Sequence, residues 1–387
     1  KVFSVISEWT ASVVYNVSFK EFAFSNVSDS DVDNFSNINL FIGENDTGKT
    51  TILKFLYANC SELREIVDNG EKDISVYSSL DKYKSKIKIH FGNSSNVSMN
   101  FAQTETAIVG LNHAKAIRLG LNYINKYDFD FTISNSKNEI ITSKKEVNDF
   151  NYDYKALFIP AKEILSIMNS IAYLKSKGIS DFDDSYNDIV FEILTQKNVD
   201  EANFLEVFKN KSKYDFYNGK VKMLNNGNKK VVYYRNDGKV YDINFVAEGI
   251  KKLGIFPILH NTGNLTKKMV LFIDEPENSL HPKLVREFMR FLVDISKDEV
   301  QIFMASHNSF VLNQLSNIAE IDNYPINVYF FLKDKENINK VNIEGPFDLS
   351  KEFPDNSITD EAYSMFKESV NVSKWRMAYR IYRQFIF

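Results

Sequence analysis

A glycine-rich loop between a strand and a helix constrains this chain more than any other feature. Residues 43–50 read Gly-Glu-Asn-Asp-Thr-Gly-Lys-Thr and match the pattern G-x-x-x-x-G-K-[ST] at every fixed position. Four of residues 38–42 are apolar, as in a buried strand (Ile38, Leu40, Phe41 and Ile42), and residues 51–57 have the spacing of an amphipathic helix. In that context the backbone N–H groups and the positive end of the helix point at an anion. The sequence therefore predicts a phosphate-binding loop.

Most positions of the loop have an expected role. Gly43 and Gly48 let the backbone pass close to a phosphate, and Lys49 would reach the β- and γ-phosphates of a nucleotide. Thr50 would give its hydroxyl to Mg²⁺, and Thr51 would meet the α-phosphate. The predicted nucleotide-binding residues of the loop are Gly43, Asn45, Asp46, Thr47, Gly48, Lys49, Thr50 and Thr51.

Polar side chains also follow two apolar segments further along the chain. Residues 269–273 lead into Asp274 and Glu275, and residues 300–306 lead into His307. Because the carboxyl ends of parallel strands lie at the same edge of a sheet, these groups should lie beside the phosphate loop. Asp274 would be the second Mg²⁺ ligand, and Glu275 would polarise the attacking water. His307 either contacts the γ-phosphate or is structural, and the spacing alone leaves both open.

Composition limits the class of protein. Of 387 residues, 44% are hydrophobic, which is enough for at least one large core. The single cysteine, Cys60, excludes an internal disulfide and favours a reducing, cytoplasmic location. No apolar run reaches the roughly 20 residues of a membrane-spanning helix, so we expect no membrane segment. The net charge of −4 and the pI near 5.9 leave only a local patch for contact with nucleic acid.

Hydrophobic periodicity predicts strands alternating with helices around a parallel sheet, with an antiparallel region between the two ends of the chain. At least two strands within residues 2–42 lead to the loop. Residues 74–150 read as an antiparallel β-subdomain with one short helix near 113–126. The other expected elements are a helix over 50–68, a strand at 156–159, helices at 161–176 and 184–209, hairpins within 209–239, helices at 247–256 and 284–296, strands at 326–346 and a helical tail at 358–386.

Charge is segregated in the middle of the chain. Residues 181–206 carry eight acids and one lysine, a net of −7, and residues 209–239 carry nine bases and two acids, a net of +7. One interpretation is two solvated faces that partly neutralise each other. The other is that the basic block, which also contains several tyrosines, meets nucleic acid or an acidic protein. The block contains no base-reading motif.

Four strings occur in the order, and roughly the spacing, of an ABC-type ATPase head. They are residues 43–51, the Ala-Glu-Gly of 247–249, the Asp-Glu-Pro-Glu-Asn-Ser-Leu-His-Pro of 274–282 and the Ala-Ser-His-Asn of 305–308. Within that class the chain resembles the OLD/RecF/SMC-like group. The resemblance covers residues 1–68 and 245–332.

The resemblance implies that a second protomer completes the nucleotide site with Glu248 and Gly249 at the start of its signature helix. It also makes His307 the switch histidine and places the loop 277–280 against the opposite subunit. The group usually has serine where Ala247 stands, and the loss of that hydroxyl leaves slow hydrolysis open.

The implied cofactors are ATP and Mg²⁺, in an α/β ABC-ATPase-like P-loop head with a mixed sheet, an inserted β-plus-helical subdomain and a C-terminal helical tail. The expected domains are 1–68 (N-terminal lobe of the head), 69–155 (antiparallel β-subdomain), 156–244 (helical insertion and basic hairpins), 245–335 (C-terminal lobe of the head) and 336–387 (strand and helical tail).

Heads of this kind resemble the ATPase subunits of anti-phage defence systems such as PARIS and Septu. That likeness implies a homo-oligomeric switch that controls a separate effector. We expect a nuclease on a separate polypeptide, because no nuclease pattern follows the head. One alternative is a DNA-repair ATPase of RecF/SMC type that binds DNA directly. The acidic pI and the lack of a long heptad arm argue against it. Another is a scaffold that binds ATP with little turnover.

Overall fold

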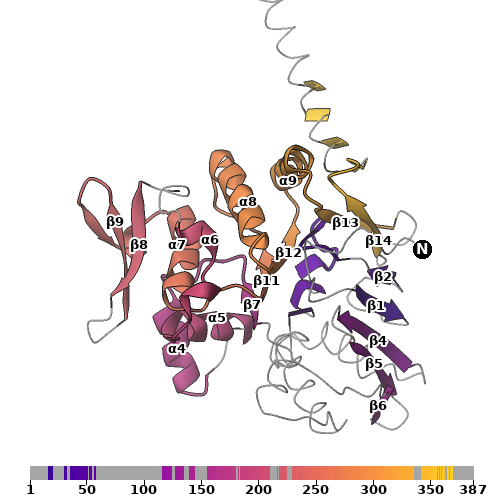
Figure 1. The fold of residues 1–387 in the computed structure, drawn as a ribbon, viewed down its shortest axis with the longest axis horizontal. Coiled ribbons are helices and arrows are strands. Elements are labelled where there is room, and N and C mark those ends of the chain that lie inside the picture. Colours follow the sequence, from indigo (N-terminus) through magenta and orange to yellow (C-terminus); the bar gives the residue numbers. More distant parts are fainter. Residues whose placement is uncertain are drawn as a thin grey trace, which may run out of the picture.

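A six-stranded sheet lies at the centre of the described structure (Figure 1). The computed structural model describes residues 16–20, 30–32, 35–50, 52–54, 56–57, 116–123, 127–134, 139–143, 155–179, 182, 184–209, 216, 218–224, 229–334 and 341–354, with scattered positions from 356 to 368. In spatial order the strands are β14 (Val341–Asp348), β13 (Asn327–Lys333), β3 (Ile38–Gly43), β12 (Val300–Ser306), β11 (Met269–Asp274) and β7 (Lys155–Ile159). All pairs are parallel except β13 with β14. This confirms the predicted α/β fold with a mixed sheet.

The two faces of the sheet differ in the kind of side chain they bury. Phe41, Phe272 and Phe303 gather on one face, and the last two rings stack with their centroids 5.2 Å apart. Tyr57, from the helix after the phosphate loop, packs on Phe272 at 5.8 Å. Residues one position along these strands are aliphatic and join the core that includes the buried side chains of α8 and α9. The strand period of two thus places the loop's helix on the aromatic face.

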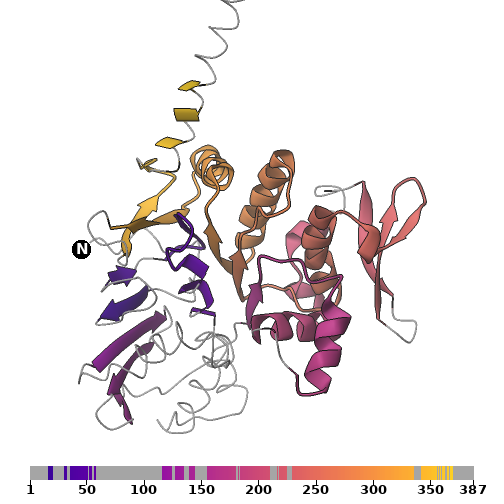
Figure 2. The same cartoon turned by 180° about the vertical axis from the view of Figure 1, so that it is seen from behind.

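Three long helices connect the strands of this sheet. They are α7 (Glu248–Asn261), α8 (Pro282–Ser296) and α9 (Ser309–Asp322), of which α8 and α9 lie side by side (Figures 1 and 2). Polar side chains fix where two of them begin. His281 Nδ1 accepts the Lys283 N–H at 3.2 Å at the start of α8, and Asn308 accepts the Phe310 N–H at 2.8 Å at the start of α9.

Two antiparallel sheets accompany the central one. The first has the order β2 (Ser30–Val32), β1 (Asn16–Lys20), β4 (Ala116–Tyr123), β5 (Tyr127–Ser134) and β6 (Glu139–Ser143). The second has the order β10 (Val240–Asp242), β9 (Lys230–Arg235) and β8 (Gly219–Leu224). The prediction of a helix near 113–126 is wrong, because β4 occupies that stretch and pairs with β1 on one side and β5 on the other. Ladder hydrogen bonds on both sides outweigh helical propensity there.

The helical region before the basic hairpins is more broken than its periodicity predicts. α4 (Met168–Ser176) begins seven residues later than expected, after the turns that follow Pro160. The stretch 184–209 divides into α5 (Asp184–Leu194), the short helix η1 (Glu201–Asn203) and α6 (Glu206–Lys209). Between them Lys197 donates its N–H to the Thr262 carbonyl at 2.8 Å, so this connection is tied to the end of α7.

Some expected elements lie outside the described residues: the second half of the helix over 50–68, the strands before residue 116 in the β-subdomain, and most of the tail 358–386. Among the helices that the structure does describe, none is both long and apolar enough to cross a membrane.

Candidate functional site

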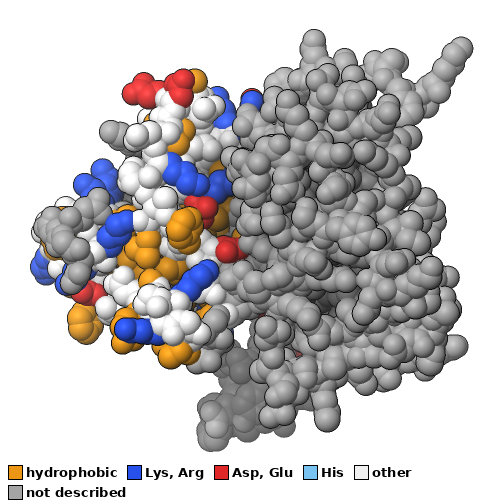
Figure 3. All heavy atoms as spheres, turned by 90° about the horizontal axis from the view of Figure 1, so that it is seen from below, with side chains coloured by type: hydrophobic (Ala, Val, Ile, Leu, Met, Phe, Trp, Pro, Cys, Tyr) orange, Lys and Arg blue, Asp and Glu red, His pale blue; other side chains and the backbone are white. Residues whose placement is uncertain are grey.

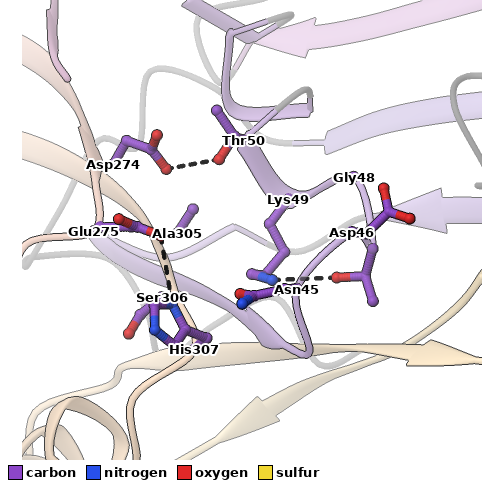
Figure 4. Close-up of a pocket in the computed structure, with 11 residues that line it drawn as sticks. Asn45, Asp46, Gly48, Lys49, Thr50, Asp274, Glu275, Ala305, Ser306 and His307 are labelled. Carbon is purple, nitrogen blue, oxygen red and sulfur yellow. Dashed lines mark hydrogen bonds and ion pairs between the residues drawn. The ribbon is translucent and has the colours of Figure 1, made fainter. Parts of the chain in front are cut away.

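A cavity of about 330 Å³ opens at the carboxyl edge of β3, β11 and β12 (Figure 4). The parallel register places the ends of these strands next to one another, so groups from three distant parts of the sequence converge there. The lining residues are Asn45, Asp46, Thr47, Gly48, Lys49, Thr50, Asp274, Glu275, Ala305, Ser306 and His307. The cavity therefore contains most of the residues that the sequence predicts to bind a nucleotide.

The backbone of the loop takes left-handed conformations at two positions. Gly48 has a φ of 81° and Asp46 a φ of 63°. Glycine adopts this region without strain, and aspartate tolerates it better than most residues. Gly43 has a different requirement: a Cβ at this position would collide with the Phe331 carbonyl of the neighbouring strand β13. The close approach of β13 is thus one requirement for a glycine at 43, and Gly43 does not line the cavity.

Lys49 points its ammonium into its own loop. Its Nζ donates to the Glu44 carbonyl at 2.6 Å and to Thr47 Oγ1 at 3.2 Å. Burial lowers the pKa of Lys49, and the nearby Asp274 opposes that effect. The exposed side of the loop carries another cation, because Lys333 at the end of β13 forms an ion pair with Glu44 at 3.8 Å. Sequence reasoning did not identify Lys333.

Thr50 and Asp274 join the loop to the end of β11. The Thr50 hydroxyl donates to the Asp274 carboxylate at 2.8 Å, although the two residues are 224 positions apart (Figure 4). Asp274 is only 8% exposed, and this burial raises its pKa to about 6. The carboxylate and the neighbouring hydroxyl together offer hard oxygen ligands. Burial leaves the negative charge of the carboxylate poorly solvated. These two side chains fit Mg²⁺, which takes one or two protein oxygens and completes its shell with phosphate and water.

Glu275 and His307 face each other across the mouth of the cavity. His307 Nδ1 lies 3.5 Å from Glu275 Oε1, and both side chains are partly exposed (Figure 4). The backbone of Glu275 lies in the left-handed region, with a φ of 43°, and its N–H donates to the Ala305 carbonyl at 2.9 Å. A non-glycine residue in this region costs free energy and occurs most often at functional sites. The pair can hold or polarise a water molecule in the cavity.

Glu248 and Gly249 do not line this cavity. They begin α7, where the Glu248 side chain forms an ion pair with Lys251 at 2.8 Å. Ala247 is the N-cap of α7 and supplies no side-chain hydrogen bond to it. Thr51, the last predicted residue of the loop, lies outside the described residues.

Three buried polar residues at or behind the cavity were not among the predicted site residues. Glu277 is 6% exposed and accepts a hydrogen bond from Ser306 at 2.7 Å. Burial raises the pKa of Glu277, which is turned inward, whereas Asn278 and Ser279 of the same turn are exposed. Lys252 of α7 is also buried, and its pKa falls to about 8 for that reason. The sequence signal for Glu277 was its place in the Asp-Glu-Pro-Glu string, and Lys252 had none.

Some charges of the two blocks form ion pairs within the chain. In the basic hairpins, Lys230 pairs with Asp242 at 2.9 Å and Arg235 with Asp237 at 3.1 Å. In the acidic block, Glu192 binds Lys155 and Lys197. Figure 3 shows Lys and Arg side chains scattered among apolar and uncharged atoms on the face that it displays. These pairs lower the free charge of each block locally, as expected for solvated faces.

Comparisons with solved structures give matches to ATPase heads. An SMC head domain from Thermotoga maritima is 13% identical, with a TM-score of 0.42, over 86% of this chain and 98% of that one. An Smc head domain with an extended coiled coil, bound to the C-terminal domain of ScpA from Pyrococcus furiosus, is 10% identical, with a TM-score of 0.40, over 92% and 99%. The ADP conformation of MJ1267, an ATP-binding cassette of an ABC transporter, is 14% identical, with a TM-score of 0.35, over 85% and 89%.

Similarities at this level say nothing about what this chain binds. A search of curated proteins gives no match. Residues 38–313 match the model of a protein family described as "AAA domain, putative AbiEii toxin, Type IV TA system", and they make up more than half of the chain. The chain belongs to this AAA domain family and is a P-loop ATPase domain, as the resemblance of its motifs predicts.

Proposed function

We propose that this chain binds ATP with Mg²⁺ in the cavity at the carboxyl edge of the sheet, hydrolyses the ATP, and uses its nucleotide state to control assembly. The observation that carries this proposal is the 2.8 Å hydrogen bond between Thr50 and Asp274. It brings together the hydroxyl and the carboxylate that would hold Mg²⁺. A loop whose only role was to begin a helix would not require its threonine to bind a buried carboxylate on a distant strand.

Each group near the cavity has a role in this proposal. The ammonium of Lys49 is 2.6 Å from the Glu44 carbonyl and would turn from it to the phosphates when ATP enters. Thr50 and Asp274 would hold Mg²⁺, which neutralises charge on the phosphate oxygens when bound. Glu275 would orient the attacking water, and His307, 3.5 Å from Glu275, would contact the γ-phosphate.

The start of α7 would act on the nucleotide of a second copy of this chain. Gly249 and Glu248 lie outside their own cavity, and the first N–H groups of a helix favour anions. Two heads facing each other would bring each α7 to the partner's γ-phosphate. Ala247 adds no hydroxyl at this helix start, so we expect slow turnover.

We further propose that the assembled ATPase acts in anti-phage defence and controls a separate effector, a nuclease. The support is the resemblance to stand-alone defence ATPases and the match to a family described as a toxin of a type IV toxin–antitoxin system. A DNA-repair ATPase that grips DNA directly is the first alternative. Two of the bases in the hairpins, Lys230 and Arg235, are already paired with acids of this chain, and the acidic pI also counts against this alternative. An ATP-binding scaffold is the second alternative, favoured by Ala247.

Steady-state ATPase assays of the wild type and Glu275→Gln, with and without DNA, test this proposal. We expect slow wild-type turnover that DNA alone does not stimulate, and a loss of at least about 100-fold in the variant. The variant should still bind ATP and should accumulate as a larger species in size-exclusion chromatography. Wild-type turnover equal to that of Glu275→Gln would favour the scaffold, and many-fold stimulation by DNA would favour the repair ATPase.

A further inference from the structure

Lys252 connects three elements behind the cavity. It lies in the second turn of α7 and is 6% exposed. Its Nζ donates to the Ala161 carbonyl, in the turn after β7, at 3.1 Å, and also to the Glu275 carbonyl in the turn after β11. The charges around the ammonium come from Asp274 at the end of β11 and from Glu275 and Glu277 in the turn that follows it. A buried ammonium with two carbonyl partners and three acids nearby is fixed in place.

These bonds hold the backbone of Glu275 from both sides. Its N–H donates to the Ala305 carbonyl of β12 at 2.9 Å, and its own carbonyl accepts from Lys252. The residue between these bonds is left-handed, with a φ of 43°, a conformation that persists only when its surroundings impose it. Because the backbone sets the direction of the Cα–Cβ bond, Lys252 also determines where the Glu275 carboxylate points.

The same helix touches the following turn near its first residues. A Cβ added at Gly249 would lie 3.1 Å from the Ser279 carbonyl and 3.2 Å from Leu280 Cδ2, so α7 packs closely on the turn 274–280. Gly249 and Lys252 are three residues apart, which places them on neighbouring positions of one rigid helix. A displacement at the start of α7 must therefore move the Lys252 ammonium and the Glu275 carbonyl bound to it.

We propose that Lys252 is a positioning residue that couples the start of α7 to the water-polarising Glu275. When a second copy binds at Gly249, the start of α7 would meet the nucleotide of that second copy. Through Lys252, the same contact would adjust Glu275 in the cavity of the chain to which this α7 belongs. This inference rests on the proposed ATPase function and deepens it, since it assigns the route by which assembly regulates hydrolysis within each head.

The test compares Lys252→Met with Lys252→Arg and with the matched control Lys251→Met. Methionine keeps the apolar stem and removes the charge and both hydrogen bonds, whereas arginine restores a donor. Lys251 is the neighbouring residue, is also 6% exposed, and pairs with Glu248 and Glu163 rather than with Glu275. The readouts are kcat and KM for ATP, with circular dichroism and a thermal melt of each variant.

We expect Lys252→Met to lower kcat by about 10- to 100-fold, with KM changed by less than about 3-fold. Lys252→Arg should recover most of the lost kcat. The kcat of Lys251→Met should stay within about 3-fold of the wild-type value. Three results would overturn the coupling: unchanged kcat in Lys252→Met, equal losses in the two Met variants, or a KM that rises as much as kcat falls. If Lys252→Met does not fold, a kcat of Lys252→Arg no better than that of Glu275→Gln overturns it instead. A wild type without turnover would instead refute the proposed ATPase function itself.

Discussion

Asp274→Asn should stabilise the ligand-free protein at neutral pH, although it removes a residue needed for function. Burial raises the pKa of the Asp274 carboxyl from 3.8 to about 6, so the folded state holds this proton more tightly than the unfolded state. At neutral pH the ionised group therefore costs the folded state about 3 kcal/mol. Asparagine has no charge to bury and still accepts from Thr50, though a neutral acceptor is weaker by about 1 kcal/mol. The expected net gain is about 2 kcal/mol.

The pH dependence distinguishes this cause from a general effect of removing an acid. The ionised Asp274 lowers the free energy of unfolding progressively as the pH rises from 3.8 to about 6. The stability gained by the variant should therefore be full at pH 7.5 and nearly gone at pH 4. Urea unfolding at both pH values, followed by circular dichroism, measures it. With a denaturant slope of about 3 kcal/mol/M, the midpoint should rise by about 0.7 M at pH 7.5. Glu201→Gln, at an exposed acid of η1, is the control and should shift little.

Addition of Mg²⁺ with ATP should remove this advantage. A ligand present at 100 times its dissociation constant stabilises the folded state by about 2.7 kcal/mol. The wild type should gain this amount, and the variant much less, because it lacks the carboxylate that would hold the metal. The reasoning is refuted if Asp274→Asn is no more stable than the wild type at pH 7.5, or if its advantage is as large at pH 4.

Three further substitutions test separate contacts. Gly43→Ala should destabilise the protein by about 2 kcal/mol or more, because the added methyl meets the Phe331 carbonyl; an unchanged urea midpoint would contradict this close approach. Tyr57→Phe should cost about 1 kcal/mol through loss of the 2.7 Å hydrogen bond to Asp188, measured in the same way, and a stability equal to that of the wild type would show that this bond contributes nothing. His307→Ala should lower kcat by about 10- to 100-fold and leave ATP affinity within about 3-fold, so a variant that turns over normally would make His307 structural.

The elements at the cavity could be predicted because their signals are local. The loop needs fixed residues within eight positions, and the strand before Asp274 is apolar at every position from Met269. The helix expected near 113–126 failed because a strand paired on both sides takes its hydrogen bonds from β1 and β5, and no local pattern reports that. The order of the strands, with β3 between β13 and β12, is likewise a matter of tertiary pairing.

Lys252 was missed for a related reason. Its partners are backbone carbonyls 91 and 23 residues away, and a carbonyl exists at every position of a chain, so the sequence carries no mark of the contact. The structure adds a second requirement for Gly43, since the sequence shows the glycine but not the strand that approaches it. Motifs thus give the identity of groups that meet the ligand, while the groups that hold them in place emerge only from the fold.

Equilibrium binding of ATP with Mg²⁺ to the wild type and to Lys49→Ala, followed by isothermal titration calorimetry, tests the central claim most directly. Loss of the ammonium that would meet the phosphates should weaken binding by about 100-fold, which corresponds to about 2.7 kcal/mol, while circular dichroism shows the fold retained. If Lys49→Ala folds and binds ATP as tightly as the wild type, the cavity at the carboxyl edge of the sheet is not the nucleotide site.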